Sequence, residues 1–98
     1  MERLSDTAIQ EALERLDGWH VVDEKWLQKK FRFKNFLSGV DFVSNVAEYA
    51  EGLQHHPFIS IDYKVVTLKI SSWQMKGITD LDVEMVEHFD ELYEKAEK

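Results

Sequence analysis

The sequence predicts an α+β fold of two layers, in which helices pack on one face of a four-stranded antiparallel sheet. Hydrophobic residues recur with a helical period in three segments and alternate with a period of two in the stretches between them. In chain order these segments read α-β-β-α-β-β-α, without a repeat, a linker or a low-complexity segment. A chain of 98 residues has room for one hydrophobic core, so we expect a single domain over residues 1–98.

The first helix and the first strand pair occupy the N-terminal third of the chain. Ser5 is a suitable N-cap residue, and Asp17-Gly18 ends the helix. Its predicted buried stripe is Ile9, Ala12, Leu13 and Leu16. Strands are expected over residues 19–23 and 25–34, with a turn at Asp23-Glu24. In the second strand one face is apolar and the other largely charged, which is typical of a sheet covered on one side only.

A longer helix and a second strand pair follow. Asn35 can cap this helix, Gly52 lies near its end, and Pro57 prevents its continuation. Its predicted stripe is Phe36, Val40, Val43, Ala47 and Ala50, widened by Phe42, Val46, Tyr49 and Leu53. Strands are expected over residues 58–63 and 65–71 around a turn at residues 62–64. The residues predicted to face the core are Ile59, Ile61, Tyr63, Val66, Leu68 and Ile70.

The last helix is predicted to begin at a capping box formed by Thr79 and Asp82. Its hydrophobic stripe is Leu81, Met85, Phe89, Leu92 and Ala96. We assign Trp26, Phe58 and Val65 to the face of the sheet that no helix covers, or to its edge. Apolar residues on an uncovered face favour self-association, so a homo-oligomer is expected, with dimer and tetramer both open.

Composition and charge exclude several classes of partner. The net charge of −7 repels phosphate backbones and anionic lipids, which disfavours direct nucleic-acid or membrane binding. No apolar run approaches the ~20 residues that span a bilayer, and cysteine is absent, so we expect a soluble cytoplasmic protein. Basic residues cluster at Lys25, Lys29, Lys30, Arg32 and Lys34. We interpret this cluster as an exposed strand face rather than a phosphate-binding patch.

Chemistry is predicted at His55-His56-Pro57, between the long helix and the second strand pair. Histidine has an ordinary pKa of ~6.5 and can exchange protons near neutrality, which suits general acid-base catalysis. The alternative is a helix-end histidine with a capping role beside an exposed neighbour. A metal site is disfavoured because adjacent residues in an extended segment point to opposite sides and no metal-ligand spacing is present. Taken alone, these residues indicate a small α+β domain with a histidine-bearing cleft.

A longer spaced pattern surrounds these histidines and identifies a family. Its parts are Glu51, His55-His56-Pro57, Tyr63, Trp73 and Asp82. Every spacing matches the signature of the pterin-4a-carbinolamine dehydratases, which the chain resembles over essentially its whole length. The resemblance implies dehydration of 4a-hydroxytetrahydropterin to quinonoid dihydropterin and water, in tetrahydrobiopterin recycling, with a reduced pterin as substrate and no metal or redox cofactor.

The resemblance also implies roles for individual residues. His55 would be an acid-base residue, and His56 would contact the pterin and share the proton transfer. Glu51 would orient or polarise an imidazole, and Asp82 would support the third catalytic position or serve only as a helix cap. Hydrogen bonds to the edge of the pterin ring would come from the backbone of Gln54, Ser71, Ser72, Trp73 and Gln74.

Many family members have a third histidine at the position of Trp73, and tryptophan is a variant that the family pattern also contains. An indole N–H donates a hydrogen bond but cannot accept a proton, so Trp73 would hold the leaving hydroxyl, stack on the ring or close the core. Family members also include dimerisation cofactors and assembly factors. The alternative function is therefore a non-enzymatic interaction protein, although the presence of Glu51, both histidines and Asp82 favours the enzyme.

Overall fold

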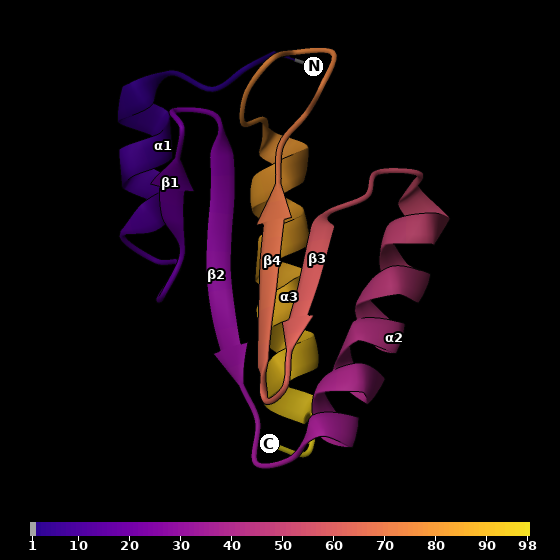
Figure 1. The fold of residues 1–98 in the computed structure, drawn as a ribbon. Coiled ribbons are helices and arrows are strands. Elements are labelled where there is room, and N and C mark those ends of the chain that lie inside the picture. Colours follow the sequence, from indigo (N-terminus) through magenta and orange to yellow (C-terminus); the bar gives the residue numbers. More distant parts are fainter. Residues whose placement is uncertain (1) are drawn as a thin grey trace.

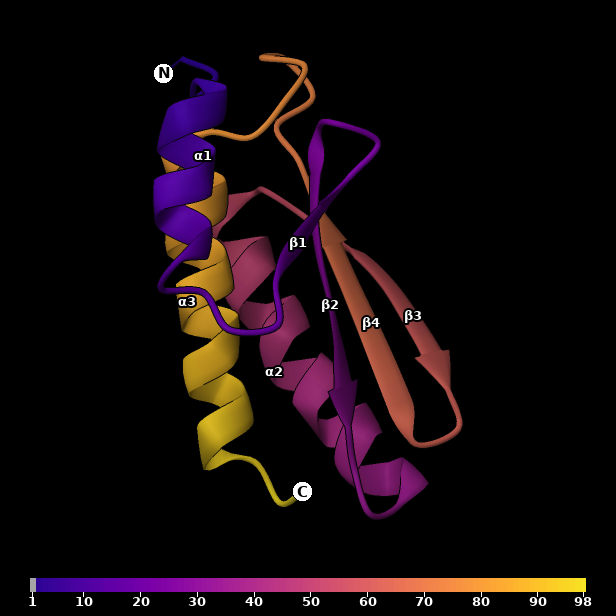
Figure 2. The ribbon, with the colours of Figure 1, turned by 90° about the vertical axis from the view of Figure 1, so that its left-hand side faces the viewer.

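The computed structural model describes residues 2–98 and contains seven elements in the predicted order. They are α1 (Asp6–Leu13), β1 (His20–Val22), β2 (Trp26–Arg32), α2 (Phe36–Leu53), β3 (Phe58–Asp62), β4 (Val65–Ile70) and α3 (Asp80–Lys95). The four strands form one antiparallel sheet in the order β1-β2-β4-β3. The three helices lie on the same side of this sheet (Figures 1 and 2). The predicted α+β fold of two layers is thus confirmed.

Strands β2 and β4 form the centre of the sheet, paired from Leu27 with Ile70 to Arg32 with Val65. Two tight turns close the hairpins. Asp23 and Glu24 both have a positive φ, which a two-residue turn between antiparallel strands favours. Strand β3 is left at one edge, beside α2 (Figure 1). The segment that carries His55 and His56 therefore runs from the end of α2 to the outermost strand.

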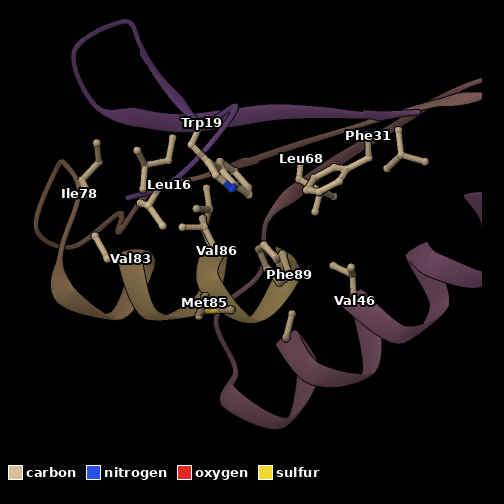
Figure 3. Close-up of a cluster of buried hydrophobic side chains, with 14 of the residues drawn as sticks. Leu16, Trp19, Phe31, Val46, Leu68, Ile78, Val83, Met85, Val86 and Phe89 are labelled. Atoms are coloured by element: carbon tan, nitrogen blue, oxygen red, sulfur yellow. The ribbon is translucent and has the colours of Figure 1, made fainter. Parts of the chain in front are cut away.

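One core fills the space between the helices and the sheet (Figure 3). Buried side chains reach it from every helix and from the two central strands, and several are completely excluded from solvent. The most deeply buried large ones are Leu27, Phe31, Phe42, Val46, Val66, Leu68, Ile70, Ile78, Met85, Val86 and Phe89. Their burial fixes α3 against the sheet, which positions the first turn of α3 and its Asp82.

All three predicted helix starts are confirmed. Ser5 accepts a hydrogen bond from the backbone N–H of Ala8, and Asn35 accepts one from Ser38. Thr79 and Asp82 form the predicted capping box. Helix α2 continues past Gly52 to Leu53, and Gln54 ends it in the left-handed conformation with a φ of 52°. This reversal directs the following residues back toward the sheet.

The buried face of α2 in the structure is rotated by part of a helical turn from the face that the sequence predicted. The helix buries Phe42, Val46 and Ala50, whereas Phe36 is 45% exposed and Ala47 is exposed. The inner face of the first turns carries Ser38 and Gly39 instead, both of which are buried. A Cβ at Gly39 would lie 3.4 Å from side-chain carbons of Phe33 and Val66, an ordinary packing distance, so these turns lie directly on those two side chains.

The prediction that Ile59, Ile61 and Tyr63 face the core is right in direction for the two isoleucines and wrong for Tyr63, and none of the three is buried. Ile59 and Ile61 pair with Leu68 and Val66, so they do lie on the helix side of the sheet. They remain 37% and 38% exposed because β3 is an edge strand that α2 covers only in part. Tyr63 lies in the turn after β3 and is 69% exposed.

Lys29 occupies a position on the apolar face of β2, between two core residues. Its ammonium reaches Asp90 of α3 at 2.8 Å, and the indole N–H of Trp19 donates to the same carboxylate at 3.0–3.1 Å. The pair joins the sheet to α3 at the margin of the core. Within the described residues, no helix has both the length and the apolar character needed to cross a membrane.

Candidate active site

The candidate active site lies at the end of the sheet where three segments meet. Residues 54–57 follow α2, residues 71–79 follow β4, and the first turn of α3 comes directly after (Figure 1). The second segment is a compact loop, in which Ser72 and Gly77 pair through two backbone hydrogen bonds. Leu4 donates a backbone hydrogen bond to Ile78 at 2.8 Å, which ties the N-terminal segment to this loop.

His55 and Asp82 form the central contact of the site. Nε2 of His55 lies 2.7 Å from Oδ1 of Asp82, although the two residues are 27 positions apart in the sequence. The Asp82 side chain is completely buried, and that of His55 is 17% exposed. Asp82 is therefore both the capping residue of α3 and the partner of an imidazole that reaches the surface.

The second oxygen of Asp82 accepts hydrogen bonds from three groups. These are the Ser72 hydroxyl at 2.8 Å, the Thr79 backbone N–H at 2.9 Å and the Thr79 hydroxyl at 3.2 Å. A carboxylate surrounded by donors can only accept, so it receives the Nε2 proton of His55. The Nδ1 atom of His55 is then the ring nitrogen left to exchange a proton with a ligand.

His56 points to a different part of the surface. Its Nε2 lies 2.7 Å from Oε1 of Glu51, and both side chains are largely exposed. Hydrogen bonding by His56, and secondly by Gln54, holds the pKa of the Glu51 carboxyl below its usual value. His56, Glu51, Pro57 and Ile59 line a hollow between α2 and β3. The two histidines thus have separate carboxylate partners on opposite sides of the chain.

A cleft of about 390 Å³ opens beside His55. Five of the predicted substrate-binding residues line it: Gln54, His55, Ser72, Trp73 and Gln74. The other two do not, because His56 lines the hollow beside α2 and Ser71 is buried with its hydroxyl directed at the Gly77 carbonyl. Leu53, Met75 and Leu81 complete the lining, and the sequence pattern did not single them out for this role.

Thr79 was predicted only as a helix cap, yet it belongs to the hydrogen-bond network behind His55. Its hydroxyl contacts that of Ser72 at 2.9 Å. The spacing of Thr79 and Asp82 was the available signal, but the contact with Ser72 requires the folded loop. Over residues 2–98, no three His, Asp or Glu side chains lie close enough together to hold a metal ion.

Trp73 stands at the rim of the cleft and is 68% exposed, so the interpretation of it as a core residue is wrong. Its ring meets Trp26 edge-on at a centroid distance of 5.8 Å and lies 6.1 Å from Phe58. Trp26 occupies the face of the sheet without helices but is only 8% exposed because these rings cover it. An exposed indole beside a cleft can stack on a flat heterocycle.

Comparison with known proteins agrees with this geometry. The family model described as "Pterin 4 alpha carbinolamine dehydratase" matches residues 2–92. The chain therefore belongs to the pterin-4a-carbinolamine dehydratase family.

Two relatives are similar over nearly all of both chains. A protein of Picosynechococcus sp. is 41% identical over 90 residues, which cover 92% of this chain and 97% of the relative. A protein of Herpetosiphon aurantiacus is 36% identical over 97 residues, which cover 99% of this chain and 100% of the relative. Both bear the name pterin-4-alpha-carbinolamine dehydratase as a provisional designation.

Two solved structures share the fold. A transcriptional coactivator/pterin dehydratase from Brucella melitensis superposes with a TM-score of 0.90 at 33% identity, covering 94% of this chain and 99% of that one. A pterin dehydratase-like protein identified as a RuBisCO assembly factor gives a TM-score of 0.68 at 17% identity, covering 81% and 96%. The second likeness concerns the fold alone.

Proposed function

We propose that this protein dehydrates 4a-hydroxytetrahydropterin to quinonoid dihydropterin and water, as a cytoplasmic hydro-lyase in tetrahydrobiopterin recycling. The observation that carries the proposal is the contact between His55 and the buried Asp82 at the cleft. Membership of the family supports the substrate class. The cleft supplies a proton-exchanging imidazole, hydrogen-bonding groups and an exposed aromatic ring, which a polar and flat substrate needs.

The reaction removes water across two adjacent atoms of the substrate. The bond between C4a and the hydroxyl oxygen breaks, and the oxygen leaves as water after it receives a proton. The N5 lone pair forms the new C=N double bond, and N5 then loses its proton. One proton is therefore delivered and one removed at neighbouring positions, so a single imidazole can perform both transfers in turn.

His55 is suited to this double role. In its charged form it donates the Nδ1 proton to the leaving hydroxyl, while Asp82 stabilises the imidazolium through Nε2. The neutral imidazole that results then accepts the proton from N5. Trp73 can assist only by donating a hydrogen bond or by stacking, because an indole cannot accept a proton. Glu51 and His56 form a pair in the neighbouring hollow, outside the lining of the cleft, and we propose that the proton transfer does not pass through them.

The purified protein is expected to accelerate the dehydration of 4a-hydroxytetrahydropterin by at least about two orders of magnitude over buffer. The reaction is followed by absorbance with substrate generated in situ, and buffer without the protein serves as the blank. A rate equal to that of buffer would contradict the proposal. If the Trp73→His variant then gained dehydratase activity, the wild-type protein would instead be a binding protein that keeps the dehydratase fold without its catalytic activity.

The alternative is an interaction or assembly protein on the same scaffold. The similar structures include one described as a transcriptional coactivator/pterin dehydratase, and by the family resemblance Trp73 stands where many members carry a histidine. An interaction protein would retain partner binding when His55 is changed to alanine. A dehydratase would lose its activity with its fold intact.

We further propose that the protein is a homo-oligomer that associates through β3. All five residues of this edge strand are exposed, and among the described strands it pairs only with β4. Ile59 and Ile61 lie uncovered on the helix side. A second copy could add its own β3 antiparallel to this edge and cover these side chains.

Multi-angle light scattering is expected to give at least twice the mass of one chain for the wild type. Ile61→Lys should shift the protein toward the monomer, because a charge would replace an apolar contact. Ser60→Lys is the matched control, since it places the same charge on the opposite face of the same strand. A monomeric wild type at micromolar concentration would contradict the proposal.

A further inference from the structure

We infer that the uncovered face of the sheet carries a second subsite next to the cleft, formed by Trp26, Phe58, Trp73 and Lys69. This aromatic-cationic patch would bind the substituent of the pterin substrate, and its chemistry selects a substituent that contains an aromatic ring and a carboxylate. The inference rests on the proposed dehydratase function and deepens it, because it names the class of reduced pterin that the site prefers.

The aromatic rings of the patch pack against one another and are not separate exposed residues. Trp26 lies at its base, with the Phe58 centroid at 4.9 Å and the Trp73 centroid at 5.8 Å. Phe58 is 48% exposed and Trp73 is 68% exposed, so both present ring surface to solvent. Aromatic rings held in this way offer stacking surface to a third ring.

Lys69 adds a positive charge to the same surface. Its Nζ lies 4.7 Å from the centroid of Trp26 and 5.4 Å from that of Phe58, which are cation–π distances. Over residues 2–98, Lys69 forms no ion pair with a carboxylate, in contrast to Lys29 on the opposite face. The neighbouring strand positions opposite Lys69 are Gln28 and Phe58, both uncharged.

The patch is continuous with the cleft through Trp73. This residue lines the cleft beside His55 and also contacts Trp26 and Phe58. Lys69, Phe58, Gln28, Ser60 and Thr67 line a shallow hollow of about 310 Å³ on the far side of these rings. A substituent that leaves the cleft past Trp73 would therefore meet the Phe58 ring and then the ammonium of Lys69.

The chemistry of the ligand follows from this order of contacts. A methyl group or a short polyol would gain little from exposed rings and an ammonium. An aromatic ring can stack on Phe58 and Trp73, and a carboxylate at its far end can pair with Lys69. The molecule carries a net charge of −7, and Lys30 shares this face on the neighbouring strand, so the attraction of Lys69 for an anion comes from its place beside the rings rather than from a general positive field.

The test compares two ligands that share the dihydropterin ring. They are 7,8-dihydrofolate, whose substituent is p-aminobenzoylglutamate, and 6-methyl-7,8-dihydropterin. Titration calorimetry of the wild type is expected to give about tenfold tighter binding of 7,8-dihydrofolate. Lys69→Gln should weaken the binding of 7,8-dihydrofolate by about fivefold and leave the affinity for 6-methyl-7,8-dihydropterin unchanged. Phe58→Leu should likewise lower the affinity for 7,8-dihydrofolate only.

Lys30→Gln is the matched control, because Lys30 lies on the same face of the neighbouring strand and its loss changes the net charge equally. It should alter neither affinity, and thermal melts should show that all three variants are folded. Equal affinity of the two ligands would overturn the inference while the proposed function stands. Failure of both ligands to bind would overturn the two together. A change in oligomer mass in Lys69→Gln, without a change in affinity, would show that this face is a subunit contact and would also overturn the inference.

Discussion

Replacement of His55 by alanine is expected to lower kcat for dehydration by about two to three orders of magnitude, with the fold intact. His55 is the imidazole that lines the cleft, and its Nε2 is held by a buried carboxylate. Its removal abolishes both proposed proton transfers. Initial rates at saturating substrate measure the effect, and circular dichroism shows whether the fold is retained.

His56→Ala is the matched control for this experiment. The residue is adjacent and of the same type, but it pairs with Glu51 on the surface and faces the hollow between α2 and β3. We expect kcat to change by less than about fivefold in this variant. Equal losses in the two variants would mean that both histidines reach the substrate, and the proposed single-imidazole mechanism would be wrong.

Replacement of Asp82 by alanine is expected to lower the free energy of unfolding by about 3–5 kcal/mol. Loss of a helix cap costs about 1 kcal/mol, and each buried donor left without an acceptor costs about 1–3 kcal/mol. The buried donors concerned are those of Ser72 and Thr79, whereas the His55 ring is 17% exposed and can turn toward water. Urea denaturation at neutral pH measures the change, and activity should fall as well because His55 loses its partner.

Two further variants make this test specific. Asp82→Asn keeps one oxygen for the cap but cannot accept from every donor, so we expect a smaller loss of stability and a large loss of activity. Asp80→Ala removes an exposed carboxylate from the same helical turn and should change stability by less than about 0.5 kcal/mol. If Asp82→Ala lowered the free energy of unfolding by less than about 1 kcal/mol, the hydrogen bonds of Asp82 would not be important for the stability of α3.

Local chemistry made much of the fold predictable. Ser5, Asn35 and Thr79 cap helices through bonds that span three residues, so their spacing in the sequence is enough to identify them. The turn at Asp23-Glu24 and the alternation along β2 are local in the same way. The inner face of α2 was not predictable with the same accuracy, because it depends on packing against side chains outside the helix, such as those of Phe33 and Val66.

The candidate site was predicted as a set of residues but not as an arrangement. The spaced pattern contained His55 and Trp73, and the family resemblance added Gln54, Ser72 and Gln74; these five residues line one cleft. It did not separate His56 from His55, since adjacent positions in a pattern carry no information on which carboxylate each ring meets. Nor did it predict that Trp73 would be exposed and packed on Trp26.

The order of the elements, the helix caps, the family and most residues of the candidate site can be inferred from the amino-acid sequence. These depend on contacts within a few positions of the chain or on a fixed spacing. The tertiary structure alone decided the pairing of His55 with Asp82, the exposure of Ile59 and Ile61 on the edge strand, and the contact of Trp73 with Trp26 and Phe58. The physical reason is that burial and hydrogen bonding between distant segments depend on strand order and on the path of the loops, which no local period specifies.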